Sequence, residues 1–294
     1  MAGCGRWNVL RPETGTLNSA VSRRNLRRCC ILKSFIIKNP MARKLNYAFR
    51  SIIPAPLQDV EIETTTICNR KCNYCPNYTV GRPSERMDEK TFYRIIDSLK
   101  KYGFKGRVSP HFYGEPLTDN RLASFIHYVH TNLPSAFIKL YTNGELLTVE
   151  RYLELKRAGV NMFRISQHTE HPSKTVSDTI SYVRENHPEL FSVSYADRFN
   201  NHFSKLNRGG LVDVITETKH TCCYVYQMTF DYLGNAVLCC NDYNSSVVFG
   251  NIKDKDTHEI WHDKTYVKIR NMIGNGFWPY DICKVCAGQK GAAA

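Results

Sequence analysis

The sequence predicts an α/β fold: a partial (β/α)6 TIM-like barrel followed by a small C-terminal α+β domain. From residue 59 onward, runs of β-branched and aromatic residues alternate with amphipathic stretches, the pattern of repeated βα units on a parallel sheet. The 294 residues, 42% of them hydrophobic, suffice for one sizeable core and a small appendage. We expect the barrel over residues 51–212, the small domain over 213–290 and a short tail over 291–294.

Short apolar runs bounded by polar or glycine-rich segments are predicted to form the strands. The five clearest runs are 60–66, 107–114, 136–142, 161–167 and 191–196. A sixth strand is predicted around 206–212. In a parallel barrel the active site forms at the C-terminal ends of the strands, so the residues that end these runs are candidate site residues.

Segments with apolar residues at three- and four-residue spacing are predicted as the helices between the strands. They are 88–103, 119–133, 148–159 and 173–187. Asp88, Asp119 and Thr148 occupy positions where N-cap residues belong. Gly103 and Gly159 stand where a helix commonly ends.

The net charge of +13 is concentrated at the N-terminus, where residues 1–50 hold eleven Lys or Arg against one acid, Glu13. Residues 51–294 carry only +3. We interpret 1–50 as a flexible basic extension that the core does not need. It is either an Arg-rich, transit-like leader or translation from a start upstream of Met41. A basic arm is also the electrostatic footprint of nucleic-acid binding, but the enzyme interpretation below predicts no nucleic-acid partner.

Twelve cysteines without a recognisable secretory signal favour metal ligation in a reducing compartment over a disulfide framework. No apolar run is long enough to span a bilayer. We therefore expect a soluble, cytoplasmic protein without a membrane partner.

Three closely spaced cysteines, Cys68, Cys72 and Cys75, occur in the run ICNRKCNYCPN, directly after the first predicted strand. Thiolates are the usual ligands of 4Fe-4S clusters, and most electron-transfer clusters take four of them. Three ligands leave one iron open to bind something else. The alternative is a zinc site or a group of buried thiols, because paired cysteines also hold zinc.

This CxxxCxYC run resembles the signature of the radical S-adenosylmethionine (SAM) superfamily. The resemblance implies that the three cysteines bind a 4Fe-4S cluster and that the amine and carboxylate of SAM chelate the open iron. It also implies that Tyr74, just before the third cysteine, lies against the adenine.

Motifs at later strand ends extend the resemblance. Gly114, Glu115 and Pro116 resemble the GGEP element of the superfamily, in which the glycine lets the backbone approach the methionine of SAM. Its alternative is a local turn. Asn143 and Ser166 are implied contacts of the ribose or carboxylate, with strand-end capping as their alternative.

Six further cysteines lie near the C-terminus, in two vicinal pairs and a final CxxC. A Gly-x4-Cys element at Gly234 on a predicted β-hairpin, followed by GNI, an IWH helix and the CxxC, resembles the twitch domain, a short form of the SPASM domain. The resemblance implies an auxiliary 4Fe-4S cluster with four thiolate ligands. The implied ligands are Cys222, Cys239, Cys283 and Cys286. Cys223 and Cys240 would then pack as small apolar residues, and a structural Cys4 zinc site is the alternative.

The motifs HFYGEPL, YTNG, SQH and LNRGG, with the C-terminal elements, resemble the aminocyclitol dehydrogenases of the superfamily over residues 58–288. Such dehydrogenases act in antibiotic biosynthesis. The resemblance implies that a 5'-deoxyadenosyl radical takes a hydrogen atom from a ring carbinol and that the remaining electron passes to the auxiliary cluster. A flavodoxin or ferredoxin would reduce the first cluster.

The same resemblance implies the substrate contacts. Glu61, Tyr113, Tyr141 and Arg208 would bind a small polyhydroxylated substrate, with Arg208, Glu61 and Tyr113 also catalytic. His168 is a candidate proton carrier because a histidine pKa lies in the useful range.

Three other functions remain open. A peptide-modifying radical enzyme would need a recognition domain, for which this chain offers only its basic extension. An aminosugar epimerase would quench the substrate radical with a thiol, for which Cys240 is a candidate. A zinc-bearing nucleic-acid binder would use the basic arm and contain no iron.

Overall fold

The computed structural model describes residues 41, 44–48, 55–187, 193–197, 207–214, 218–222 and 224–289. The chain divides into two compact units, Met1–Asn46 and Tyr47–Ala294. All elements described below belong to the second unit. The basic extension predicted for 1–50 falls almost entirely outside the described residues, and the proposed boundary at 212 stays a prediction.

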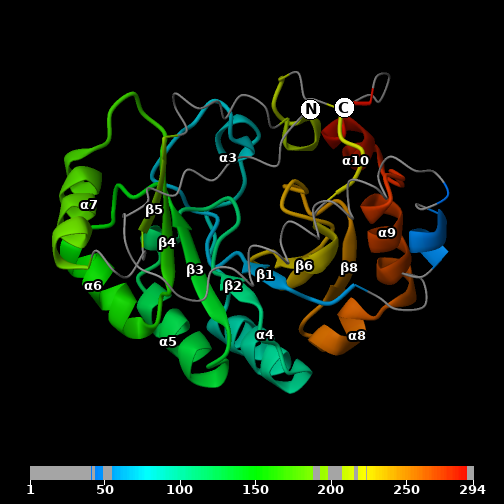
Figure 1. Cartoon of the computed structure of the whole chain (residues 1–294), viewed down its shortest axis with the longest axis horizontal. Helices are drawn as coiled ribbons and strands as arrows, with labels where there is room; N and C mark the ends of the chain where they lie inside the picture. Colours follow the sequence, from blue (N-terminus) through cyan, green and yellow to red (C-terminus); the bar gives the residue numbers. More distant parts are fainter. Residues whose placement is uncertain are drawn as a thin grey trace. The chain divides into compact units, whose positions relative to one another are not determined.

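One curved sheet organises the described part of the second unit (Figure 1). Its strands are β1 (Asp59–Ile62), β2 (Arg107–Ser109), β3 (Phe137–Thr142), β4 (Met162–Gln167), β5 (Val193–Asp197), β6 (Gln227–Phe230), β7 (Asn235–Val237) and β8 (Val248–Asn251). Their order is β5-β4-β3-β2-β1-β6-β7-β8. Neighbours from β5 through β6 pair in parallel, whereas β6, β7 and β8 pair antiparallel. The sheet is therefore shared between the barrel and the C-terminal domain.

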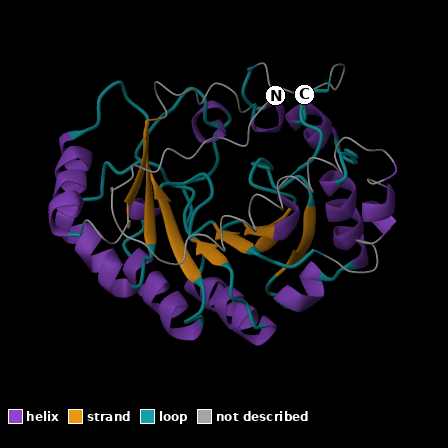
Figure 2. Cartoon of the chain, in the orientation of Figure 1, coloured by secondary structure: helices purple, strands orange, loops and turns teal. Residues whose placement is uncertain are grey.

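Most helices lie along one side of this sheet, whereas the short helices 76–79 and 281–286 lie at the top of the view, away from that side (Figure 1 and Figure 2). The helices are α3 (Pro76–Thr79), α4 (Glu89–Tyr102), α5 (Leu122–Asn132), α6 (Val149–Ala158), α7 (Lys174–Asn186), α8 (Thr257–Trp261), α9 (Lys264–Gly274) and α10 (Asp281–Cys286), with short 3-10 turns η1 (Pro116–Thr118), η4 (Arg208–Gly210) and η5 (Tyr224–Tyr226). Within the described ranges, none of the helices combines the length and apolar character needed to cross a bilayer.

Strand alternation separates an apolar face from a polar one. Val60 and Ile62 of β1 join the main core with residues such as Phe92 and Leu99 of α4. Fully burying each such side chain stabilises the fold by about 1.5–3 kcal/mol. Glu61 points to the opposite face because successive strand side chains alternate. The face of β1 away from α4 consequently carries the polar side chain of Glu61.

Most predicted helix ends are confirmed. Asp88 accepts a hydrogen bond from the Thr91 N–H (3.0 Å), and Thr148 accepts one from the Arg151 N–H (3.2 Å). Gly103 ends α4 with a φ of 74°, and Gly159 ends α6 with a φ of 123°. These positive φ values favour glycine over residues with a Cβ.

The prediction for Asp119 was wrong. Helix α5 begins after Arg121, and Asp119 instead accepts from the backbone N–H (3.1 Å) and side chain of Arg121. The preceding 3-10 turn η1 displaces the helix start, because its Pro116 begins a separate turn that ends at Thr118.

The sixth strand predicted at 206–212 was also wrong in place. Residue 206 lies outside the described residues, and Arg208, Gly209 and Gly210 have φ values of 50°, 71° and 102°. Positive φ is incompatible with a strand. The sixth parallel strand is β6, which pairs with β1, so that β1 is a central strand.

The C-terminal elements follow the predicted order. Gly234, with a φ of 86°, lies in the turn of the β6–β7 hairpin, and Cys239 follows β7. The first two residues of GNI, Gly250 and Asn251, end β8, while α8 contains Ile260 and Trp261 and α10 carries the CxxC. The predicted hairpin and helix are confirmed.

Candidate functional site

The predicted site residues come from the strands and the segments that follow them. Glu61 lies on β1, Tyr141 on β3 and Ser166 on β4, whereas Tyr113 follows β2 and Arg208 lies in η4. Because β1 to β4 run parallel, their C-terminal ends share one edge of the sheet. The structure therefore brings Glu61, Tyr113, Tyr141 and Arg208 towards one region.

The first cysteine loop presents three half-buried thiols, those of Cys68, Cys72 and Cys75. The Arg70 N–H points to the Cys68 sulfur at 3.4 Å. Burial raises the pKa of Cys68 to about 11, and the nearby Cys72 and Cys75 add to the rise. The hydrogen bond from the Arg70 N–H opposes it. Three thiols on one short loop match the ligand chemistry of an iron-sulfur cluster, in which metal binding displaces the thiol protons.

Glu115 ties the turn after Gly114 to the end of β3. Its Oε1 accepts from the Thr142 hydroxyl (2.7 Å), and its Oε2 accepts from the Asn143 N–H (2.8 Å). Burial raises the pKa of Glu115 to about 7, although these hydrogen bonds oppose the rise. The residue thus has a structural role in the chain itself, in addition to its predicted position near the cofactor.

Gly114 is required by chain packing. A Cβ added at Gly114 would lie 1.9 Å from the carbonyl oxygen of Thr65 and 2.8 Å from its carbonyl carbon. Both atoms belong to the backbone that connects β1 to the first cysteine loop. The close approach therefore sets the cysteine loop against the turn that begins at Gly114.

Side chains from the cysteine loop bind the later strand ends. The Asn143 amide donates to the Asn69 Oδ1 (2.8 Å), and Arg70 forms an ion pair with Glu145. The Tyr74 hydroxyl and His168 Nδ1 are 2.7 Å apart. His168 is accordingly placed beside the residue predicted to face the adenine.

The candidate substrate groups include buried atoms without partners. Glu61 is 8% exposed, and its Oε2 has no hydrogen-bond partner in the described part of the chain; the same holds for the Tyr113 hydroxyl. Burial raises the pKa of Glu61 to about 7, although the positive charge of Arg107 opposes the rise. Leaving a buried polar atom unpaired costs about 1–3 kcal/mol. A polar ligand at this position would recover that cost.

Arg208 joins this group from the C-terminal side. Its guanidinium carbon lies 5.7 Å from the centre of the Tyr113 ring. The Asn207 amide donates to the Val285 carbonyl in α10 (2.8 Å), which attaches η4 to the helix that carries Cys283 and Cys286. The turn that presents Arg208 is thereby anchored to the second cysteine group.

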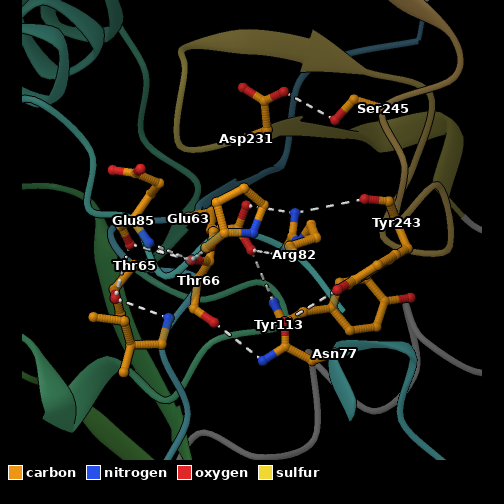
Figure 3. Close-up of polar contacts among 12 residues, drawn as sticks. Glu63, Thr65, Thr66, Asn77, Arg82, Glu85, Tyr113, Asp231, Tyr243 and Ser245 are labelled. Carbon is orange, nitrogen blue, oxygen red and sulfur yellow. Dashed lines mark hydrogen bonds and ion pairs between the residues drawn. The ribbon is translucent and has the colours of Figure 1, made fainter. Parts of the chain in front are cut away.

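A buried ion pair between Glu63 and Arg82 connects the two cysteine regions (Figure 3). Arg82 also lies over the Tyr243 ring, 4.3 Å from its centre, and the Tyr113 N–H points to Glu63 at 3.4 Å. The Tyr243 hydroxyl donates to Asn77 just after the first cysteine loop (3.3 Å). The sequence analysis did not predict this network. Its signal is Glu63, a carboxylate in the buried run after β1, which indicates that a cation lies nearby.

The second cysteine group contains the four predicted ligands. Cys239 lies within electrostatic range of Cys222 and Cys286, and Cys283 lies within range of Cys286. The Asn241 N–H points to the Cys239 sulfur at 3.4 Å, and Lys219 Nζ lies 3.3 Å from the Cys286 sulfur. Hydrogen bonds to sulfur are a known influence on cluster properties, so this environment also fits a cluster.

The two vicinal cysteines are placed differently. Cys240 packs beside the small apolar cluster of Phe112, Tyr113, Val237 and Tyr243. Cys223 lies outside the described residues. The predicted packing role of Cys240 agrees with this contact, and the choice between Cys222 and Cys223 as ligand stays a prediction.

Comparison with known proteins gives this geometry a family. The Radical SAM superfamily profile matches residues 62–189, and the profile of the SPASM iron-sulfur cluster-binding domain matches 222–287. The S-adenosyl-L-methionine-dependent 2-deoxy-scyllo-inosamine dehydrogenase of Niallia circulans is 32% identical over 235 residues, which cover 77% of this chain and 91% of that protein. The chain belongs to the radical SAM superfamily.

Solved structures agree with this radical SAM assignment. The crystal structure of BtrN in complex with AdoMet and 2-DOIA matches with a TM-score of 0.70 and 29% identity, covering 81% of this chain and 95% of that one. BtrN in an open conformation matches with a TM-score of 0.61 and 27% identity, covering 80% and 94%. The partial barrel with a C-terminal SPASM-type domain is confirmed. The protein is a radical SAM enzyme that uses SAM and 4Fe-4S clusters.

Proposed function

We propose that this radical SAM enzyme oxidises a secondary alcohol of an aminocyclitol or related sugar to a ketone. The observation that carries the proposal is the position of Tyr113. It lies near enough to Cys75 of the first cysteine group and to Cys239 of the second for both thiols to contribute to the raised pKa of its hydroxyl. Tyr113 also lies beside Arg208. A substrate held there would lie between both candidate clusters.

The bound cofactors would supply a 5'-deoxyadenosyl radical for hydrogen abstraction and, at the auxiliary cluster, an acceptor for the remaining electron. The first cluster would be held by Cys68, Cys72 and Cys75, and the auxiliary one by Cys222, Cys239, Cys283 and Cys286. SAM would contact Tyr74, Gly114, Glu115, Pro116, Asn143 and Ser166. The thiol environments described above support these ligand sets.

The chain's own side chains would bind and orient the substrate. Arg208 remains protonated at any ordinary pH, so it would stabilise the negative charge that develops as the hydroxyl loses its proton. Glu61 would accept a hydrogen bond from a ring hydroxyl or pair with a ring amine through its unpartnered oxygen. Tyr113 and Tyr141 would add hydroxyl and ring contacts.

We infer that a flavodoxin- or ferredoxin-type protein delivers the first electron, because the reaction requires a low-potential donor. A reducing cytoplasm suits this chemistry because its glutathione and thioredoxin systems keep cysteine thiols reduced. The first substrate to test is 2-deoxy-scyllo-inosamine, which the name of the relative from Niallia circulans contains.

The test is anaerobic reconstitution followed by iron counting and turnover with SAM and 2-deoxy-scyllo-inosamine. About eight irons, stoichiometric 5'-deoxyadenosine and a product lighter by two hydrogen atoms would support the dehydrogenase. Formation of 5'-deoxyadenosine without a lighter product from any aminocyclitol would reject this substrate class. Zinc in place of the second cluster would reject the electron-acceptor role.

An epimerase is the second candidate, because Cys240 lies within electrostatic range of Glu61 and Arg208. Its thiol would return a hydrogen atom to the substrate radical instead of allowing electron loss. The thiyl radical left on Cys240 would then take up one electron from the auxiliary cluster and one proton. Turnover in D2O distinguishes the two, because an epimerase gives an isomer of the substrate in which one carbon-bound hydrogen is replaced by solvent deuterium. A ketone product would exclude it.

A further inference from the structure

We propose that Ser109 and His111 form a hydroxyl-binding subsite that selects an uncharged ring substituent of the substrate. This inference rests on the proposed function and adds to it, since neither residue belongs to the predicted substrate contacts. Ser109 ends β2, and His111 follows two residues later in the same segment.

Unpartnered buried atoms concentrate around this subsite. Apart from arginine nitrogens, the described part of the chain has five side chains with a buried polar atom lacking any hydrogen-bond partner: Glu61, Ser109, His111, Tyr113 and Tyr195. Four of these five lie on β1 or within 109–113. Native proteins leave few buried polar atoms unpaired, so such a concentration indicates a missing polar ligand.

The subsite is continuous with the candidate substrate contacts. Ser109 is fully buried and is the register partner of Glu61 on β1. The His111 ring lies 5.0 Å from the Tyr141 ring, measured between centres. His111 also lies within electrostatic range of Arg208. One small ring could therefore contact groups on β1, β2 and β3 together.

The chemistry of His111 suits a hydroxyl. Burial, with a smaller contribution from Arg208, lowers the pKa of His111 to about 4. A neutral imidazole has one donor and one acceptor nitrogen, and the serine hydroxyl can likewise donate and accept. A ring hydroxyl does the same, whereas an ammonium group only donates. Glu61 would then be left for a ring amine.

The test uses the reconstituted holoenzyme with SAM and a panel of aminocyclitols, each lacking one hydroxyl. His111→Phe keeps a planar ring without nitrogen, His111→Gln restores a donor and an acceptor, and Ser109→Ala removes the other hydroxyl partner. His127→Gln, at an exposed position of α5, is the control.

We expect His111→Phe to raise KM for the complete substrate about tenfold while leaving KM for one deoxy analogue unchanged. His111→Gln should recover part of the loss, and Ser109→Ala should weaken discrimination at the same hydroxyl as His111→Phe. Dissociation constants from equilibrium titration should change in parallel.

Equal increases for every analogue, or none for any, would overturn the subsite while the wild-type enzyme still formed the ketone. A wild-type enzyme that binds and oxidises no aminocyclitol would instead overturn the proposed function, and the subsite with it. Thermal unfolding identifies a variant that fails to fold, in which case His111→Gln and Ser109→Ala carry the test.

Discussion

The backbone conformation of Arg208 and the hydrogen bond of its neighbour Asn207 together fix the position of the Arg208 side chain. Its backbone has a φ of 50°, a region that side chains other than glycine enter at a cost of about 1–2 kcal/mol. Asn207, just before it, is held by the Val285 carbonyl. Strain at a non-glycine residue is commonly retained where the side chain has a function.

Replacing Arg208 with Met should lower ketone formation about 100-fold or more, because one charged donor at a developing oxyanion contributes on that order. Arg208→Lys keeps the charge and the same backbone cost, so it should retain part of the activity. The measurement is product formed per 5'-deoxyadenosine. If Arg208→Met formed as much ketone per 5'-deoxyadenosine as the wild type, this role of Arg208 would be contradicted.

Glu61 should make stability depend on pH. Its pKa in the folded protein is raised from 4.5 to about 7 by burial, so between these values the folded state holds a proton that the unfolded state has released. Stability therefore falls as pH rises through this window, by up to about 1.4 kcal/mol per pH unit for each such group. Glu63 and Glu115 are raised in the same direction.

The variant Glu61→Gln should gain stability relative to wild type as the pH rises from 5 to 8, as measured by urea unfolding at several pH values. Glu185→Gln, at an exposed position of α7, serves as the control and should keep the wild-type slope. Identical slopes for wild type and Glu61→Gln would show that Glu61 is not held protonated.

At the scale of elements, the cysteine loop and the turn after β2 depend on each other. Gly114 lies against the Thr65 backbone, and the Glu115 N–H donates to the Ile67 carbonyl (2.8 Å) just before Cys68. The first cysteine loop is thus positioned by a neighbouring strand end as well as by its own sequence.

Gly114→Ala should destabilise the protein by about 2 kcal/mol or more, because backbone atoms must move to admit the methyl group. Gly103→Ala is a matched control, since its φ of 74° is strained but its Cβ would meet nothing within 4 Å. That variant should cost about 1 kcal/mol. Urea unfolding compares them, and equal losses would refute the packing argument.

At the scale of the whole described unit, one sheet connects both cysteine groups. Strand β1 pairs with β2 on one side and β6 on the other, so the first cysteine loop and the hairpin before Cys239 extend from adjacent strands. The Glu63–Arg82 pair and Tyr243 reinforce this connection.

Cys239→Ala should lower the iron content from about eight to about four per chain, because it removes a ligand of one cluster. SAM cleavage should persist while ketone formation stops, since the electron acceptor is lost. Cys240→Ala is the vicinal control and should keep its iron. Loss of iron from Cys240→Ala alone would reverse the assignment.

Local patterns predicted the elements well where the interactions that form them are local. Asp88 and Thr148 cap their helices as expected, and Gly234 turns the hairpin. Asp119 and the strand at 206–212 were mispredicted because a neighbouring turn and positive φ values overrode the local pattern.

By itself, the sequence determined the α/β class, the two cysteine groups and their order along the chain, because strand periodicity and ligand spacing are local properties. Only the tertiary structure decided that β6 lies beside β1, that Arg82 pairs with Glu63, and that His111 faces Tyr141. These contacts join residues far apart in the chain. They depend on which strands become neighbours, and the burial of unpaired polar atoms appears only after that arrangement has formed.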